Sequence, residues 1–183
     1  MKTCIVHLKV DRKVLEKNNL FAAIEPVYWA LNIDDGPEEY KRSLQGFSRS
    51  QRLILAVWWY RAEVNNGGHG QFYFNGTGVM WKDALDGLAA LDLEQHASIL
   101  RESARRFDGE PPLDTQARRN ALESQRPCFD DLDRRFYKLA ESTDLDFKML
   151  DFVRRNLDDF AFEGAVERPL PPGTWTPETD IEA

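Results

Sequence analysis

The sequence has few of the residues that build metal centres, redox sites and disulfide frameworks. It contains two cysteines, Cys4 and Cys128, which stand far apart and follow no metal-ligand or redox spacing. Its three histidines, His7, His69 and His96, form no pair that would place two ligands on one helix face. We therefore expect no metal ion, no cofactor and no disulfide, and the two free thiols favour a reducing, cytoplasmic location.

A long hydrophobic run is also missing. The longest run, LILAVWWY at residues 53–60, has eight residues, whereas a membrane-spanning helix needs about 20. Residues 1–13 carry charged side chains where a secretory signal requires an apolar stretch. The glycine-rich segment at residues 63–78 lacks the Lys-Ser/Thr pair of a phosphate-binding loop. These absences predict no membrane span, no export signal and no nucleotide site.

Basic residues are outnumbered, and the deficit is local. The 183 residues include 24 Lys and Arg against 31 Asp and Glu, which gives a formal net charge of −7. Residues 1–47 and 48–109 are each electrically balanced, so the whole surplus lies in residues 110–183. A negative field repels nucleic acid and attracts basic partners. We expect no direct binding of DNA or RNA, and we expect any acidic surface to be C-terminal.

Apolar residues recur at helical spacing through most of the chain, which predicts an all-α, single-domain, irregular helical bundle of about seven or eight helices. Residues 50–66 are apolar on nearly every side, as in a buried central helix. Ser48 and Gln51 form a capping-box pattern at its start, and Gly67-Gly68 is suited to its end. Later helices are expected to begin at caps provided by Asp92 and Thr143.

The two ends of the chain are predicted to differ from the helical part. Residues 3–10 alternate weakly and predict a short N-terminal strand, with no second convincing strand to pair with it. Residues 164–183 combine prolines with acidic residues and predict a Pro-rich acidic tail. The helical domain is therefore expected to span residues 1–163.

The segment at residues 63–78, EVNNGGHGQFYFNGTG, is unlike the rest of the chain because it gathers five glycines, three asparagines, a histidine and three aromatic residues. One interpretation is structural. The glycines end the central helix, a short aromatic helix follows and inserts Phe72 and Phe74 into the core, and Asn75-Gly76 forms the turn that exits.

The other interpretation of this segment is functional. Polar side chains held near a loop against a buried helix can line a pocket for a small ligand or a substrate. The candidates are Glu63, Asn66, Gln71 and Asn75. His69 could also form an acid/base pair with Glu63 across the loop. The two interpretations are compatible, and both stay open at this stage.

The same segment carries a family resemblance. Trp-Trp-Tyr at residues 58–60, Glu63, Asn-Gly-Gly at 66–68 and the run from Gln71 to Asn75 are followed by FDDLDRRFY and an acidic last helix. Together they resemble the bacterial DNA-mimic protein family, largely a domain of unknown function, over about residues 20–160. The resemblance implies an all-helical fold without a cofactor. For the characterised kind of member, it implies an acidic surface that imitates DNA phosphates and occupies a DNA-binding regulator.

Carboxylates of the last helices are the candidate partner-binding residues: Asp130, Asp133, Asp146, Asp151, Asp158, Asp159 and Glu163. Spacing of four residues predicts ion pairs that neutralise part of this surface. The expected pairs are Asp130–Arg134, Asp131–Arg135, Asp144–Lys148 and Asp151–Arg155. Four arginine pairs are likewise expected in surface ion pairs: Arg105-Arg106, Arg118-Arg119, Arg134-Arg135 and Arg154-Arg155.

These features predict a non-enzymatic protein-interaction module whose partner is a basic DNA-binding protein, engaged by a DNA-mimicking acidic C-terminal surface. A homodimer remains open. The alternative is a small-ligand-binding protein or an enzyme that uses the Glu63, Asn66, Gln71 and Asn75 pocket.

Overall fold

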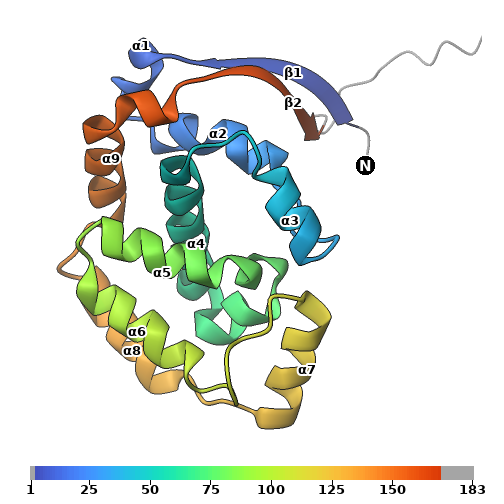
Figure 1. Cartoon of the computed structure of the whole chain (residues 1–183). Coiled ribbons are helices and arrows are strands. Elements are labelled where there is room, and N and C mark those ends of the chain that lie inside the picture. The colour runs from blue at the N-terminus through green and yellow to red at the C-terminus, as the bar shows by residue number, and fades with distance from the viewer. Residues whose placement is uncertain (1–2, 170–183) are drawn as a thin grey trace, which may run out of the picture.

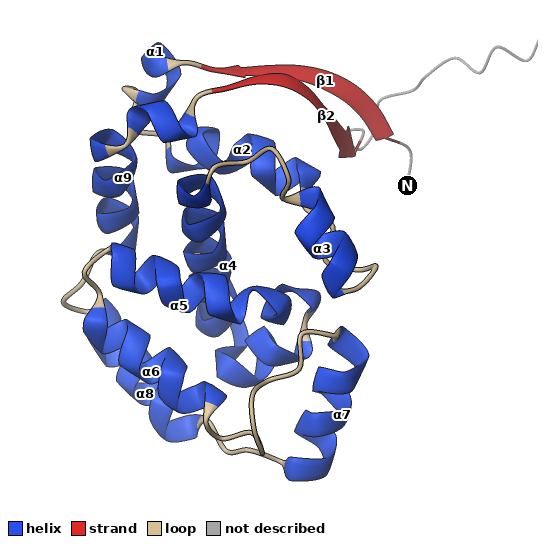
Figure 2. Cartoon of the chain, viewed as in Figure 1, coloured by secondary structure: helices blue, strands red, loops and turns tan. Residues whose placement is uncertain are grey.

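The computed structural model describes residues 3–169, and within this range the chain is mainly helical with one small antiparallel sheet (Figures 1 and 2). The elements in chain order are β1 (Thr3–Val10), α1 (Arg12–Leu15), α2 (Leu20–Ala30), α3 (Pro37–Ser43), α4 (Arg49–Phe74), the 3-10 helix η1 (Gly76–Met80), α5 (Trp81–Ala90), α6 (Glu94–Ala104), α7 (Thr115–Gln125), α8 (Asp130–Ala140), α9 (Leu145–Arg155), the 3-10 helix η2 (Leu157–Phe160) and β2 (Phe162–Pro169). None of the helices in this range is long and apolar enough to cross a membrane.

Helix α4 is the central element, as predicted. Ser48 and Gln51 form the expected capping box, in which each side chain accepts a hydrogen bond from the backbone of the other residue. The helix contacts α2, α5, α7 and α8, which surround it in Figure 1. Side chains on several of its sides, including those of Ile54, Val57 and Tyr60, are therefore completely buried.

The predicted break at the two glycines is present inside α4. Gly67 and Gly68 leave the helical conformation, and Gly68 has a φ of +73°, which favours glycine. The helical conformation then resumes and runs to Phe74, as expected for a short aromatic helix after the glycines. Phe72 is buried as expected, but Phe74 is 52% exposed, and the neighbouring Tyr73 occupies the core instead.

The fold is not all-α, because a second strand is present. β1 pairs with β2 in antiparallel register from Thr3 opposite Pro169 to Val10 opposite Phe162. The strand expected at residues 3–10 is confirmed, while residues 164–169, predicted to belong to the tail, form most of its partner. Alternate residues of β2 face inward towards α2, with Val166 buried. The remainder of the predicted tail, residues 170–183, lies outside the described residues.

Two predicted helix caps are each wrong by one position. Asp92 adopts a left-handed conformation with a φ of +56°, and α6 begins after Leu93 without a side-chain cap. The last long helix is capped by Asp144 rather than Thr143, because the Asp144 carboxylate accepts a 2.9 Å hydrogen bond from the backbone N–H of Phe147.

Candidate functional site

The polar residues of the segment at 63–78 form a buried network around Glu63, which is 7% exposed. Its Oε2 accepts hydrogen bonds from Gln71 Nε2 at 2.7 Å and Asn75 Nδ2 at 2.9 Å. Its Oε1 accepts a 2.8 Å hydrogen bond from the hydroxyl of Thr77, a residue that the sequence did not single out. Three neutral donors thus satisfy the carboxylate and tie the start of the segment to its end.

Asn66 is the candidate that the structure does not bring to this network. It is exposed just before the kink, whereas Gln71 and Asn75 are partly buried beside Glu63. None of these four residues lines any of the surface cavities described below. The network therefore holds two halves of a kinked helix together and leaves no carboxylate oxygen directed at a ligand.

A buried arginine completes this structural cluster. The Arg118 side chain, fully buried on α7, donates hydrogen bonds to four backbone carbonyl oxygens at the end of α4 and before α7. The acceptors are those of Tyr73 (2.6 Å), Asn75 (2.7 Å), Pro112 (2.9 Å) and Leu113 (2.9 Å). Burial lowers the pKa of Arg118 to about 10. The prediction that Arg118 lies in a surface ion pair is wrong, because its partners are carbonyl groups that no local sequence pattern identifies.

His69 pairs with Asp133 rather than with Glu63. Asp133 Oδ1 accepts hydrogen bonds from the backbone N–H of His69 at 2.9 Å and from its ring Nδ1 at 2.5 Å, and His69 Nε2 lies 2.8 Å from the hydroxyl of Tyr60. His69 and Tyr60 are both 0% exposed. Burial raises the pKa of Asp133, but hydrogen bonds from the His69 ring and backbone outweigh it and lower the pKa below its usual value. Asp133 is therefore only 20% exposed and is held by His69 instead of being free to contact a partner.

Most of the other candidate acids lie at the surface next to a cation or a donor. Asp146 pairs with Arg61 at 2.5 Å, Glu163 with Lys9 at 2.9 Å, Asp151 with Arg155 at 3.0 Å, and Asp159 accepts a 2.5 Å hydrogen bond from Ser50. Asp130 and Asp158 are exposed and have no ion pair within residues 3–169. The exposed surface of α9 also carries Lys148, Arg154 and Arg155. Cations thus lie between Asp133 and Asp146, between Asp146 and Asp151, and between Asp151 and Asp158 along the chain.

Only one of the four predicted helical ion pairs is present in the described structure, the pair of Asp151 with Arg155. Asp131 instead contacts Arg106 at 2.6 Å, and Arg135 contacts Glu102 at 2.5 Å. Both new partners come from α6 or the turn that follows it. The charges of Asp131 and Arg135 are therefore neutralised, but by residues of neighbouring elements and not by residues four positions away on the same helix.

A polar surface hollow of about 500 Å³ lies at the turn between α8 and α9. Glu141 and Asp144 line it from the turn, and Arg61 and Asn65 line it from α4. Both acids are exposed, and neither has an ion pair among the described residues. Asp144 was predicted to be neutralised by Lys148. Its position directly before an apolar helical stripe is the signal for a helix cap instead, and as a cap it keeps its charge free of a cation.

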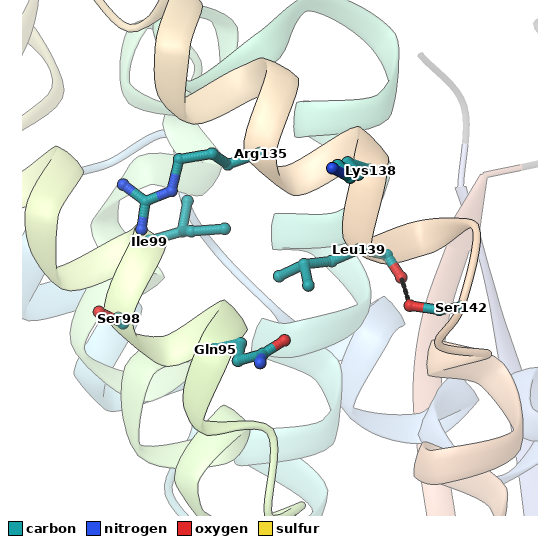
Figure 3. Close-up of a pocket in the computed structure, with 7 residues that line it drawn as sticks. All are labelled: Gln95, Ser98, Ile99, Arg135, Lys138, Leu139 and Ser142. Carbon is teal, nitrogen blue, oxygen red and sulfur yellow. Dashed lines mark hydrogen bonds between the residues drawn. The ribbon is translucent and has the colours of Figure 1, made fainter.

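A second cavity, of about 440 Å³, lies between α6 and α8 and is lined by basic instead of acidic residues (Figure 3). Ile99 and Leu139 extend towards each other across it, and Arg135 and Lys138 lie on its α8 side. The acidic hollow and this basic cavity are neighbours, because Ser142 lines both. No group of three or more His, Cys, Asp or Glu side chains in the described part of the chain is placed to hold a metal ion.

Comparison with known families agrees with the resemblance noted in the sequence. A family model described as DMP19-like protein matches residues 45–156, more than half of the chain. The chain therefore belongs to the DMP19-like family, a family of DNA mimic proteins. No curated protein and no solved structure matches it significantly.

Proposed function

We propose that this protein binds a basic, DNA-binding protein in place of DNA, and that the contact is centred on the hollow at the α8–α9 turn. The main support is that two exposed carboxylates line one cavity, those of Glu141 and Asp144. Neither has a cation partner in the described structure. Membership of a DNA mimic family supports the same class of partner. The proposal moves the expected binding surface from the seven candidate acids to this turn and the start of α9.

The hollow suits a basic side chain. Its volume of about 500 Å³ leaves room for an arginine or lysine, and hydrogen bonds between a guanidinium and a carboxylate are roughly twice as strong as neutral ones. Asp151 lies seven residues after Asp144 and therefore on the same face of α9. The two are roughly 10 Å apart along the helix axis, and three nucleotides of one DNA strand advance about the same distance along the DNA axis, at about 3.4 Å each.

We expect this role to be non-enzymatic. Glu63 and His69, the candidates for acid/base chemistry, are buried and already hydrogen-bonded to Gln71, Asn75 and Asp133. A general acid or base must reach the proton that it transfers, within about 3 Å or through one water. No specific observation favours the small-ligand alternative for this segment, and its residues account for each other's hydrogen bonds.

A pair of matched double variants tests the proposal. Glu141→Gln with Asp144→Asn removes both free carboxylates of the hollow, and Asn preserves the helix cap. The control, Asp108→Asn with Glu123→Gln, makes the same change in charge at exposed positions before and on α7, on the other side of the molecule from α9 (Figure 1). The immobilised full-length protein is used to capture partners from a cell lysate, and duplex DNA is then added as a competitor.

The proposal expects a captured protein that binds DNA, that duplex DNA displaces, and that the hollow variant no longer retains while the control does. Retention should also fall steeply between about 50 mM and 200 mM salt, as for protein–DNA contacts. Equal retention by both variants, retention that DNA does not reduce, or capture of no DNA-binding protein would overturn it.

A further inference from the structure

We propose that a surface pocket between α3 and the starts of α4 and α5 binds a small carboxylate with a compact apolar body. The pocket has a volume of about 220 Å³ and is lined by Arg52, Lys41, Lys82 and Asp83 together with apolar side chains. It is separate from the α8–α9 hollow and shares no lining residue with it. The inference therefore goes beyond the proposed function and does not depend on it.

Arg52 supplies the feature that points to a ligand. Its Nε is buried and has no hydrogen-bond partner, and no ion pair within residues 3–169 includes its guanidinium. The neighbouring basic residues differ, since Lys41 pairs with Glu38 at 2.8 Å and Lys82 with Glu110 at 2.5 Å. A buried donor without a partner costs about 1–3 kcal/mol. An anion bound in the pocket, which Arg52 lines, would pair with the charge of its guanidinium.

The one acid in the pocket wall is already engaged. Tyr40, which is 8% exposed, donates a 2.5 Å hydrogen bond from its hydroxyl to Asp83 Oδ2. Burial and the adjacent Asp83 raise the pKa of Tyr40, so the hydroxyl keeps its proton and remains a donor. Asp83 is therefore held by Tyr40 and forms no ion pair with Arg52 in the described structure.

The lysines at the pocket edge can shift towards a bound anion. The side chains in the pairs of Lys41 with Glu38 and Lys82 with Glu110 are 53–77% exposed. Such surface pairs contribute about 0–1 kcal/mol, so exchanging one for a ligand carboxylate costs little. Glu38 and Glu110 repel an anion at longer range, so we expect weak binding.

The walls and the size of the pocket select the ligand. Pro37, Leu44, Val79 and Leu113 contribute apolar surface. A planar carboxylate matches the fork of a guanidinium, and an apolar body attached to it would cover these walls. Inorganic phosphate would satisfy Arg52 but leave the apolar walls in water. The arrangement therefore favours a compact, apolar carboxylate over a bare anion.

A titration of the full-length protein tests this. The probes are 3-methylbutanoate, its uncharged counterpart 3-methylbutanamide, and inorganic phosphate, followed by NMR of the methyl groups of Leu44, Val79 and Leu113. We expect saturable shifts of these methyl signals with the carboxylate alone, at a dissociation constant on the order of 1 mM. Arg52→Gln should weaken binding at least about 10-fold. Arg49→Gln, one turn earlier at an exposed residue paired with Asp86, should leave it unchanged.

Each other outcome overturns the proposal. Equal shifts with the amide would show that Arg52 is not used, and equal shifts with phosphate would show a general anion site that ignores the apolar walls. Shifts with none of the probes would show that the pocket is not a ligand site. The titration of the unaltered protein decides between these outcomes even if Arg52→Gln fails to fold.

Discussion

Replacing Arg118 by alanine should destabilise the protein severely, although no proposed binding surface includes this residue. Its guanidinium donates hydrogen bonds to four backbone carbonyls at 2.6–2.9 Å and joins α7 to the end of α4. Each hydrogen bond to a charged group contributes about 1.5–3 kcal/mol. The net stabilisation is smaller than the sum of these four contributions, because burying the charge has a cost, which also lowers the pKa of Arg118 to about 10. In the alanine variant, water can also enter part of the space that the side chain leaves.

We therefore expect Arg118→Ala to reduce the free energy of unfolding by about 3–5 kcal/mol, as for other broken buried charge networks. That is a large part of a typical stability of about 5–15 kcal/mol. Arg118→Lys should recover little, since one ammonium group cannot reach four divergent carbonyls.

Urea unfolding followed by circular dichroism measures these changes, and the neighbouring residue provides the control. Arg119 donates one hydrogen bond to the Phe74 carbonyl at 2.8 Å and lies over the Phe74 ring at 4.5 Å, at the surface. Arg119→Ala should cost about 1 kcal/mol. A loss below about 1 kcal/mol for Arg118→Ala, or equal losses at the two positions, would refute the assigned role of Arg118.

Two further predictions concern carboxylates. The pKa of Asp133 is lowered in the folded state, so its contribution to stability is present above its unfolded-state pKa of about 3.9 and is lost as the pH falls through its folded-state pKa. Asp133→Asn should remove this part of the acid dependence of the free energy of unfolding, measured by urea unfolding between about pH 7 and pH 3. Arg155→Gln frees Asp151 from its ion pair and should tighten binding of the captured DNA-binding partner. The control is Arg154→Gln, which removes the same charge at a residue that contacts Asn18 and not Asp151. The gain should be several-fold larger for Arg155→Gln, and equal effects would contradict a role for Asp151.

Local features of the fold could be predicted from the sequence. The capping box at Ser48 and Gln51 and the kink at Gly67 and Gly68 depend only on residues within a few positions of each other. The partner of β1 could not be found in this way. β2 begins at Phe162, 152 residues after the end of β1. Its alternate residues face inward, and the strand ends at Pro169, where the sequence becomes Pro-rich. The prolines and acidic residues of this region predict a tail, although pairing with β1 stabilises its first residues as a strand.

The candidate site shows the same division between local and tertiary information. The sequence groups Glu63, Gln71 and Asn75 with Asn66, and the structure brings the first three together because they lie on the two sides of one kink. Asp133 and Asp131 were assigned to the surface or to helical pairs, yet His69 and Arg106 from distant segments hold them. Spacing along a helix identifies which charges can meet, but it does not reveal a stronger donor on another element.

The pairing of surface acids changes how a DNA mimic of this kind would work. A bare row of carboxylates would attract a basic partner at long range, but here Asp146 and Asp151 already have cations. Since an exposed ion pair contributes only about 0–1 kcal/mol, an arginine of the partner can replace Arg155 at small cost. Under the proposed function, the free carboxylates Glu141 and Asp144 would provide the initial attraction, and exchange along α9 would extend the contact. On this mechanism, the specificity for one DNA-binding protein follows from which pairs its basic residues can reach and replace.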